Sequence, residues 1–358
     1  MQEIVIYRFL QGIFASSLVP ISQSFVFDAY APEERGRAMG WWSLGVMAGM
    51  VSGPAIGGYL AEFHSWRWAF YINVPIGLLA FGLIYVFGPK RSHRPAAQPF
   101  GLMGFLLLSL GLVFTQIVLS RGERMDWFSA PQIIWATILA AIAFYLFGVH
   151  SAYSSHPFIA RRVLSDRNFM IGFVCLFLLG LQWLSFLTLI SPYLQSLAGY
   201  PVFLAGLVMV PQAVGNAVGS VLGGQLVGRV HPLKLMACGV LALAWANWHM
   251  SLLNPDFNRI EFYSIVFLHG FGIGIFFVPL TVVTFSTLPR QYRDVGTGLF
   301  SLARNLGSSV GVSLVIAYLV RETQANRHIL KDYVSPFNEV FRHIAAVSYT
   351  HLTLPTKA

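Results

Sequence analysis

Two arginines stand inside long apolar runs of the sequence, where a charged group needs a partner or a water-filled cavity. Arg8 lies in the run 4–28, and Arg304 lies in the run 296–320. A guanidinium stays charged where solvation is poor, and beside a carboxyl group it favours the ionised form of that group. A change in the distance between two such groups can therefore release or take up a proton. The alternative for Arg8 is a side chain that extends to the nearby membrane surface.

Further polar side chains inside apolar runs share single faces of their predicted helices. We expect a cavity lined by five of them: Gln212, Asn216, Ser301, Arg304 and Asn305. Hydrogen bonds between helices are the alternative for this group. His249 and His269 are interpreted as structural residues. The sequence contains no cluster of His, Asp and Glu at one interface, so we predict no metal, no cofactor and no enzymatic activity.

The composition requires lipid as the solvent of most side chains. Hydrophobic residues make up 56% of the 358 residues and charged residues 10%, against about 25% charged in a soluble domain. Backbone groups in a bilayer must bond within their own segment, so each apolar run is a predicted helix. The fold class is therefore an all-α polytopic membrane protein. We predict ten transmembrane helices, at 4–28, 39–60, 68–88, 100–119, 131–150, 169–193, 203–225, 233–253, 262–286 and 296–320.

The basic residues set the predicted orientation. The net charge of +9 is spread over the loops between runs, which argues for a role in topology and against a nucleic-acid partner. Most of the loop Lys and Arg follow the odd-numbered runs, as Arg35 and Arg293 do, so these loops are predicted to be cytoplasmic. Asp28, at the cytoplasmic end of the first run, is expected to be a solvated helix cap. Because the first run then enters from outside, we expect a truncated start.

An internal repeat relates the first two runs to the last two. A shift of 258 residues pairs Phe9 with Phe267 and Arg35 with Arg293, and it also matches several glycines and serines. Eight predicted helices separate the copies, an even number, so both copies should insert in the same direction. A parallel repeat of this kind relates the two halves of many transporters. We predict that residues 9–53 superpose on residues 267–311.

Glycines recur every four residues in the second run, at Gly45, Gly49, Gly53 and Gly57. Small residues at this spacing form a smooth stripe that lets another helix approach closely in lipid. We expect this stripe to meet the helix that carries the matching series Gly215, Gly219 and Gly223.

The second run as a whole resembles motif C, the antiporter signature in the fifth helix of major facilitator exporters. The residues that carry this resemblance are Gly40, Gly49, Gly53, Pro54, Gly57 and Gly58. The stretch with Arg8, Gln11 and Gly12 resembles motif B, found in the fourth helix of proton-linked members. The resemblance implies that these three residues take part in proton coupling.

Several shorter stretches are similar to the EmrB/QacA type of this superfamily, which has fourteen helices. They include Trp66-Arg67-Trp68, Ile72-Asn73-Val74-Pro75, Asp126-Trp127-Phe128-Ser129 and Arg167-Asn168-Phe169. A degenerate copy of a third motif, motif A, is present at 224–229. Gly228 stands there in place of the acidic residue, which puts the conformational latch of that motif in doubt.

The resemblance covers residues 1–346 and implies a partial major facilitator fold, from the fourth to the thirteenth helix. It divides the chain into a three-helix remnant of the N-terminal half (1–98), a two-helix linker (99–166) and five helices of the C-terminal half (167–346). Residues 347–358 match no element and resemble a translated sequencing adapter, so they are interpreted as a non-native tail.

By resemblance, the expected function is proton-coupled efflux of lipophilic or amphipathic drugs across the bacterial inner membrane. A periplasmic adaptor and an outer-membrane channel are the implied protein partners. A solute:H⁺ symporter is the first alternative, disfavoured by the complete motif C. A membrane-embedded lipid-modifying enzyme would need the acidic and His cluster that the sequence lacks. A membrane scaffold would have no use for Arg8 and Arg304 within its spans.

Overall fold

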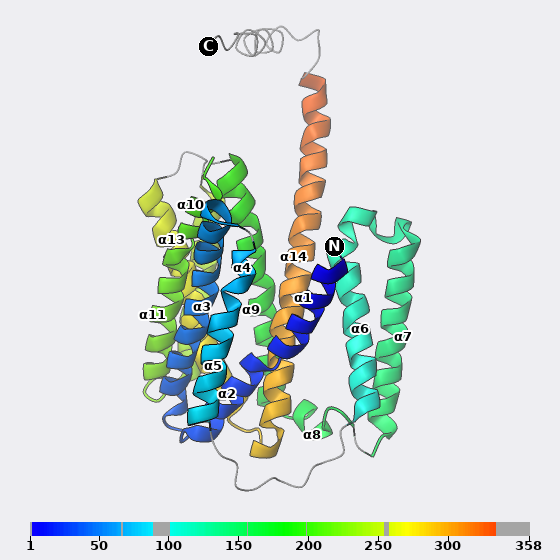
Figure 1. Cartoon of the computed structure of the whole chain (residues 1–358), viewed down its shortest axis with the longest axis vertical. Helices are drawn as coiled ribbons and strands as arrows, with labels where there is room; N and C mark the ends of the chain where they lie inside the picture. The colour runs from blue at the N-terminus through cyan, green and yellow to red at the C-terminus, as the bar shows by residue number, and fades with distance from the viewer. Residues whose placement is uncertain are drawn as a thin grey trace.

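The computed structural model describes residues 2–65, 67–88, 101–155, 157–197, 199–253 and 258–333. All regular structure in this part of the chain is helical, and most helices lie roughly along one common direction (Figure 1). The residues around the predicted boundary at 98, Trp66 and the predicted tail at 347–358 lie outside the described residues.

Each of the ten predicted runs contains a helix. Seven are single helices: α3 (Arg35–Phe63), α6 (Leu102–Arg121), α7 (Pro131–Tyr153), α9 (Arg167–Pro192), α12 (Pro232–Ser251), α13 (Arg259–Thr284) and α14 (Arg293–Tyr333). Three runs are split: α1 (Gln2–Ala15) and α2 (Leu18–Ala29), α4 (Trp68–Tyr71) and α5 (Asn73–Phe87), and α10 (Val202–Leu207) and α11 (Val210–Leu226). A short helix, α8 (Arg161–Leu164), precedes α9.

The three splits share one local cause. Pro20, Pro75 and Pro211 each lie in the first turn of the second piece, in α2, α5 and α11. Proline cannot donate a backbone hydrogen bond, and the first turn of a helix is where that donor has no helical acceptor. The chain therefore restarts its helix just before each proline.

Six of the helical segments in the described residues are long and apolar enough to cross a membrane by themselves. They are Ile4–Ala29, Leu102–Arg121, Pro131–Tyr153, Arg167–Ser196, Arg259–Thr284 and Arg290–Ile329. The other predicted runs form α3, α5, α11 and α12, which are shorter or contain more glycine and polar residues. The predicted all-α polytopic class is confirmed.

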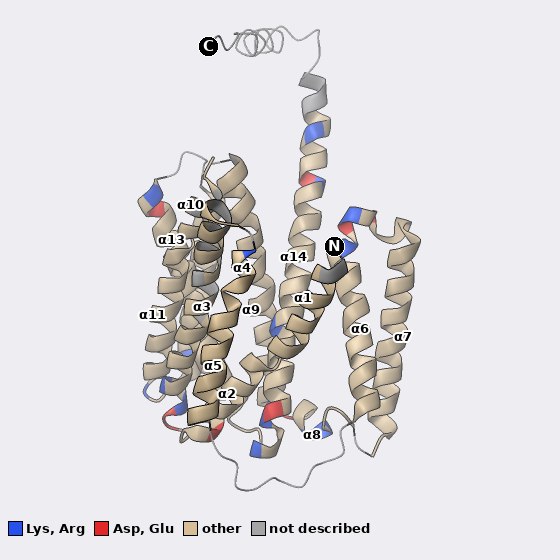
Figure 2. Cartoon of the chain, in the orientation of Figure 1, with Lys and Arg blue, Asp and Glu red and all other residues tan. Residues whose placement is uncertain are grey.

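The two copies of the sequence repeat run in the same direction (Figure 1). The pair α1–α2 descends in this view and α3 ascends, and likewise α13 descends and α14 ascends. This agrees with the parallel repeat predicted from the 258-residue shift. The end at which α3 and α14 begin is the one that the basic residues assign to the cytoplasm, and it is called the cytoplasmic end below. Most Lys, Arg, Asp and Glu residues lie at helix ends and turns (Figure 2).

Glycines bring the helices of the C-terminal half into backbone contact. A Cβ atom added at Gly270 of α13 would lie 1.8 Å from the carbonyl oxygen of Gln212 in α11. Added at Gly215 or Gly219 of α11, it would lie 2.0 or 2.3 Å from a carbonyl oxygen of α13. Gly307 of α14 approaches α9 in the same way. Only glycine permits such approaches, so these helices pack without intervening side chains.

The predicted meeting of the two glycine stripes is wrong. The series Gly215, Gly219 and Gly223 packs on α13. Within the described part of the chain, a Cβ atom at Gly45, Gly49, Gly53 or Gly57 would meet no atom within 4 Å. Helix α3 does pack on α11, but it uses glycines nearer the cytoplasmic end. A Cβ atom at Gly36 or Gly40 would lie 2.9 Å from the carbonyl oxygen of Gly224 or Ser220. Glycines at four-residue spacing identify a smooth face of one helix. Which helix packs on that face depends on the crossing angle between the two helices.

Candidate functional site: the interface between the two halves

An ion pair joins the two halves at the cytoplasmic end. Asp28, at the end of α2, lies 3.1 Å from the guanidinium of Arg293 and 3.2 Å from that of Arg290. Arg293 also donates a 3.3 Å hydrogen bond to the carbonyl oxygen of Phe27. Next to this pair, the hydroxyl of Ser24 donates to the carboxylate of Asp294. Asp28 is exposed at the end of α2, as expected from the sequence, but α14 also supplies it with two cationic partners.

The cations around Asp28 are crowded. Arg35, at the start of α3, has its guanidinium 5.9 Å from the centre of the Phe27 ring. Burial lowers the pKa of Arg35, and the like charge of Arg293 lowers it further, while Asp28 acts in the opposite direction. The Nε atoms of Arg35 and Arg293 are buried without a hydrogen-bond partner among the described residues. Asp28 thus pairs with two arginines of α14, while Arg35 and Arg293 lie close enough to repel each other.

Polar side chains continue from this end into the contact between α3 and α11. Ser43 and Ser220, both buried, lie 3.0 Å apart through their hydroxyl groups. Ser220 also donates to the amide oxygen of Asn216 at 3.2 Å. A polar group at this depth needs a partner, because no water is available to replace one. These bonds fix how α3 of one half sits on α11 of the other.

A small cavity lies beside this polar contact. It has a volume of about 20 Å³ and is lined from both halves by Trp42, Ser43, Val46, Leu179, Trp183, Asn216, Ile273, Phe277 and Arg304. A space of this size holds about one water molecule. The cavity therefore brings together Asn216 and Arg304, two of the five predicted lining residues, in a conformation too closed for a drug-sized molecule.

The other three predicted lining residues lie elsewhere. Gln212 is buried and lies 3.0 Å, through Nε2, from Nδ1 of His269, so it makes the interhelical hydrogen bond that was the alternative. Gln182 lies 2.7 Å from the other ring nitrogen of His269. Phe186 stacks on that ring at a centroid distance of 3.7 Å. These contacts fit the structural role expected of His269. Ser301 and Asn305 are on α14 but do not line the cavity of Asn216 and Arg304.

The predicted proton-coupling residues lie on α1. The guanidinium of Arg8 is 4.6 Å from the centre of the Phe70 ring and donates a 2.9 Å hydrogen bond to the side-chain oxygen of Gln11. A cation above an aromatic face is attracted by the negative charge of the ring. Among the side chains that the structure describes, no carboxylate lies within ion-pair distance of Arg8. Next to it, Gly12 leaves open space where a side chain would stand.

The predicted motif C residues have different surroundings. Gly40 is in close contact with α11, whereas Gly49, Gly53 and Gly57 leave space beside α3. Pro54 and Gly58 are helical, and their surroundings lie outside what the structure describes.

Sequence reasoning missed the residues that join the halves. The repeat contained one signal for them, since it aligned Arg35 with Arg293, two arginines at the starts of equivalent helices. The acidic partner Asp28 had no counterpart in the repeat, and its contact with α14 depends on how the halves meet.

Comparison with known proteins identifies the family. The model of the Major Facilitator Superfamily matches residues 2–312. The chain belongs to this superfamily. Among curated major facilitator proteins, it is 30% identical to the multidrug export protein EmrB of Escherichia coli K12 over 94% of this chain and 66% of EmrB. It is equally similar to the probable multidrug resistance protein EmrY of the same strain, with the same coverage.

A third relative is the fatty acid resistance protein FarB of Neisseria gonorrhoeae, 28% identical over 97% of this chain and 68% of FarB. The resemblance to EmrB-type major facilitator proteins is thus confirmed. The chain spans just under two thirds of the length of EmrB.

Proposed function

We propose that the protein belongs to a proton-coupled multidrug exporter that moves lipophilic or amphipathic compounds by alternating access. The observation that carries this proposal is the contact of two parallel-repeat halves at the cytoplasmic end, through Asp28 and Arg293. A small closed cavity, lined from both halves, lies between them. The names of EmrB, EmrY and FarB, which refer to multidrug export and to drug or fatty acid resistance, agree with it.

The Asp28 ion pairs would act as the cytoplasmic gate. Separation of α2 from α14 would break them and open the cavity of Asn216 and Arg304 to the cytoplasm and inner leaflet. Trp42, Trp183 and Phe277 would then offer flat apolar surfaces to a lipophilic compound. Motif C, along α3, would support this movement because its glycines let α3 slide past a neighbouring helix without steric clash.

Arg8 would couple the gate to proton movement. The structure offers its guanidinium an aromatic face and the side chain of Gln11, both neutral partners. Approach of a protonated carboxyl group to Arg8 would favour release of the proton, and withdrawal would favour its uptake. We place that carboxyl group outside the described side chains, since none of those forms an ion pair with Arg8.

The remaining features of the proposal come from relatives of the EmrB type. The division into an N-terminal half, a two-helix linker at 99–166 and a C-terminal half agrees with the separate α6–α7 hairpin in Figure 1. We further propose residence in the bacterial inner membrane and assembly with a periplasmic adaptor and an outer-membrane channel.

The test is accumulation of a fluorescent lipophilic cation in cells that lack their own drug exporters. Expression of the whole transporter should lower steady-state dye accumulation, and an uncoupler that collapses the proton gradient should remove the difference. Dye accumulation that rises on expression and falls with the uncoupler would point to symport. Insensitivity to the uncoupler would contradict proton coupling.

A further inference from the structure

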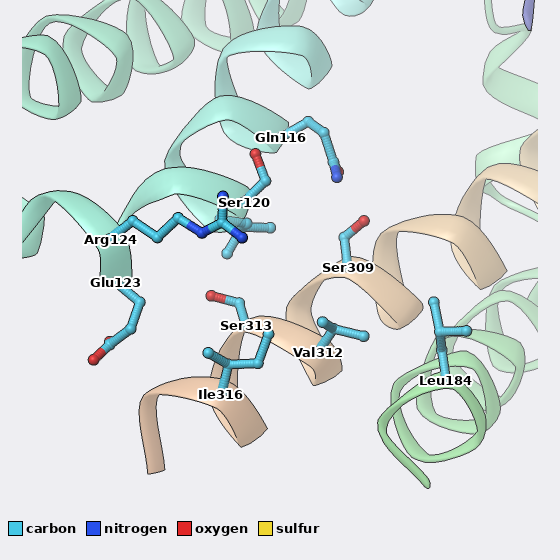
Figure 3. Close-up of a pocket in the computed structure, with 10 residues that line it drawn as sticks. Gln116, Ser120, Glu123, Arg124, Leu184, Ser309, Val312, Ser313 and Ile316 are labelled. Carbon is cyan, nitrogen blue, oxygen red and sulfur yellow. The ribbon is translucent and has the colours of Figure 1, made fainter. Parts of the chain in front are cut away.

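A groove between the α6–α7 hairpin and the C-terminal half takes no part in the transport mechanism proposed above. It has a volume of about 260 Å³ and is lined by Gln116, Leu119, Ser120, Glu123, Arg124, Leu184, Ser309, Val312, Ser313 and Ile316. Figure 3 shows the side chains of α6, and of the short 3₁₀ helix η1 (Glu123–Met125) after it, facing those of α14 across the groove. The groove lies toward the end of the molecule opposite the cytoplasmic end.

The polar groups of the groove follow both helices at intervals of one turn. On one side they are Gln116, Ser120 and Arg124, and on the other Ser309 and Ser313. Four residues of helix rise about 6 Å. The guanidinium is therefore nearest the membrane surface, and the hydroxyl and amide groups lie one and two turns deeper. This sequence of groups, a cation above neutral hydrogen-bond donors, is unusual for a face directed at hydrocarbon.

Several of these groups lack a partner among the described residues. Ser313 is 6% exposed, and its hydroxyl makes no hydrogen bond within the described part of the chain. The amide of Gln116, which is exposed, makes none there either. The guanidinium of Arg124 has no ion pair there either. Glu123, which also lines the groove, accepts a 2.7 Å hydrogen bond from the indole of Trp127 (Figure 3). Polar groups at this depth need acceptors, which hydrocarbon cannot supply.

We propose that the groove binds a phospholipid of the outer leaflet. Its phosphodiester group would accept hydrogen bonds from Arg124, whose planar guanidinium suits phosphate. Its ester carbonyl groups, which only accept hydrogen bonds, lie deeper than the phosphate and would meet the donors Ser313 and Gln116. An acyl chain would fill the apolar side of the groove, against Leu119, Leu184, Val312 and Ile316.

The charge on the rim favours this occupant. Arg124 lines the groove just beyond the end of α6, while the one acidic residue of the groove is already bonded to Trp127. Basic residues near a membrane surface attract anionic lipid headgroups. The bound lipid would fill the space that separates α6 from α14 and so hold the hairpin on the C-terminal half.

Native mass spectrometry of the purified whole chain tests the proposal. The probe is 1-palmitoyl-2-oleoyl phosphatidylglycerol, titrated into protein from which the lipid has been removed in detergent. Arg124→Gln should weaken binding of the first lipid molecule by about tenfold, the loss expected for a charge-assisted hydrogen bond. Arg121→Gln is the matched control, since Arg121 is exposed at the same helix end but does not line the groove. It should leave the first binding step within about twofold of wild type.

A second variant separates charge from shape. Ser313→Leu keeps Arg124 but fills the groove and removes a donor, so it should also lower the binding of the first lipid. Equal binding by Arg124→Gln and Arg121→Gln, or unchanged binding in Ser313→Leu, would overturn the proposal. A lipophilic drug that occupies the groove and displaces the lipid at equal concentration would instead assign the groove to transported compounds. Each experiment measures lipid binding. Its result is therefore independent of whether the transporter exports drugs.

Discussion

At the scale of single residues, one aspartate and two arginines form the ion pairs that join the halves at the cytoplasmic end. Asp28 is exposed to solvent over 34% of its side chain, and Arg293 over 13%. Arg290 is exposed over 73%. An ion pair gains more when its members are shielded from water, so the bond to Arg293 should dominate over the bond to Arg290.

The first prediction follows from this difference. Arg293→Gln should open the cytoplasmic end, because Asp28 then loses its shielded partner. The expected increase in the open population is about tenfold, equivalent to about 1.4 kcal/mol. Labelling of a cysteine placed at Ser24 by a water-soluble maleimide measures the opening. Arg290→Gln is the control and should change labelling by less than about twofold. Equal labelling of the two variants would show that the shielded pair does not hold the gate.

The second prediction concerns Arg8. In the whole transporter, Arg8→Ala should abolish substrate-induced proton release while leaving substrate binding largely intact. Arg8→Lys should keep part of the coupling, because the charge survives but the planar group that lies over Phe70 and reaches Gln11 is lost. The measurement is proton release from purified protein in weak buffer, beside a direct binding assay. Wild-type proton release from Arg8→Ala would show that Arg8 only extends to the membrane surface.

At the scale of helices, the sequence predicted the position of each helix along the chain. It did not predict which helices pack against each other. Apolar length predicts a span because every backbone group must be bonded within it, a condition local to the run. The prolines account for the splits that the runs did not predict. The glycine stripes of α3 and α11 were assigned to each other wrongly, since spacing reveals a smooth face but not the crossing angle. The bond between Gln212 and His269 was likewise invisible before α11 and α13 were placed side by side.

The third prediction tests which glycines pack helices together. Gly270→Ala should lower the stability of the protein by about 1–3 kcal/mol, because the new methyl group would overlap the backbone of α11 at Gln212. Gly53→Ala, where the structure leaves space, should keep or slightly raise the melting temperature. Thermal unfolding in detergent, followed by tryptophan fluorescence, compares the two. A loss of stability at Gly53 as large as at Gly270 would mean that α3 packs on another helix through its glycine stripe.

At the scale of the whole molecule, the parallel repeat and the placement of the cavity belong together. The repeat aligned α1–α2 and α3 with α13 and α14, and these helices run in matching directions (Figure 1). The cavity of Asn216 and Arg304 lies where the halves meet, next to the contact of α3 with α11. The sequence could predict the two halves and the class of transporter. It could not predict that the cavity is as small as about 20 Å³, because that depends on how the helices of the two halves meet.

Exchange of drug for protons, in opposite directions, is the central claim. Its most direct test is transport in proteoliposomes that contain the purified whole transporter, with an imposed pH gradient and internal and external pH indicators. The account predicts that a lipophilic cation moves into vesicles that are acidic inside while protons leave them. Arg8→Ala should abolish both movements. Movement of drug and protons in the same direction, or drug movement unaffected by the pH gradient, would contradict it.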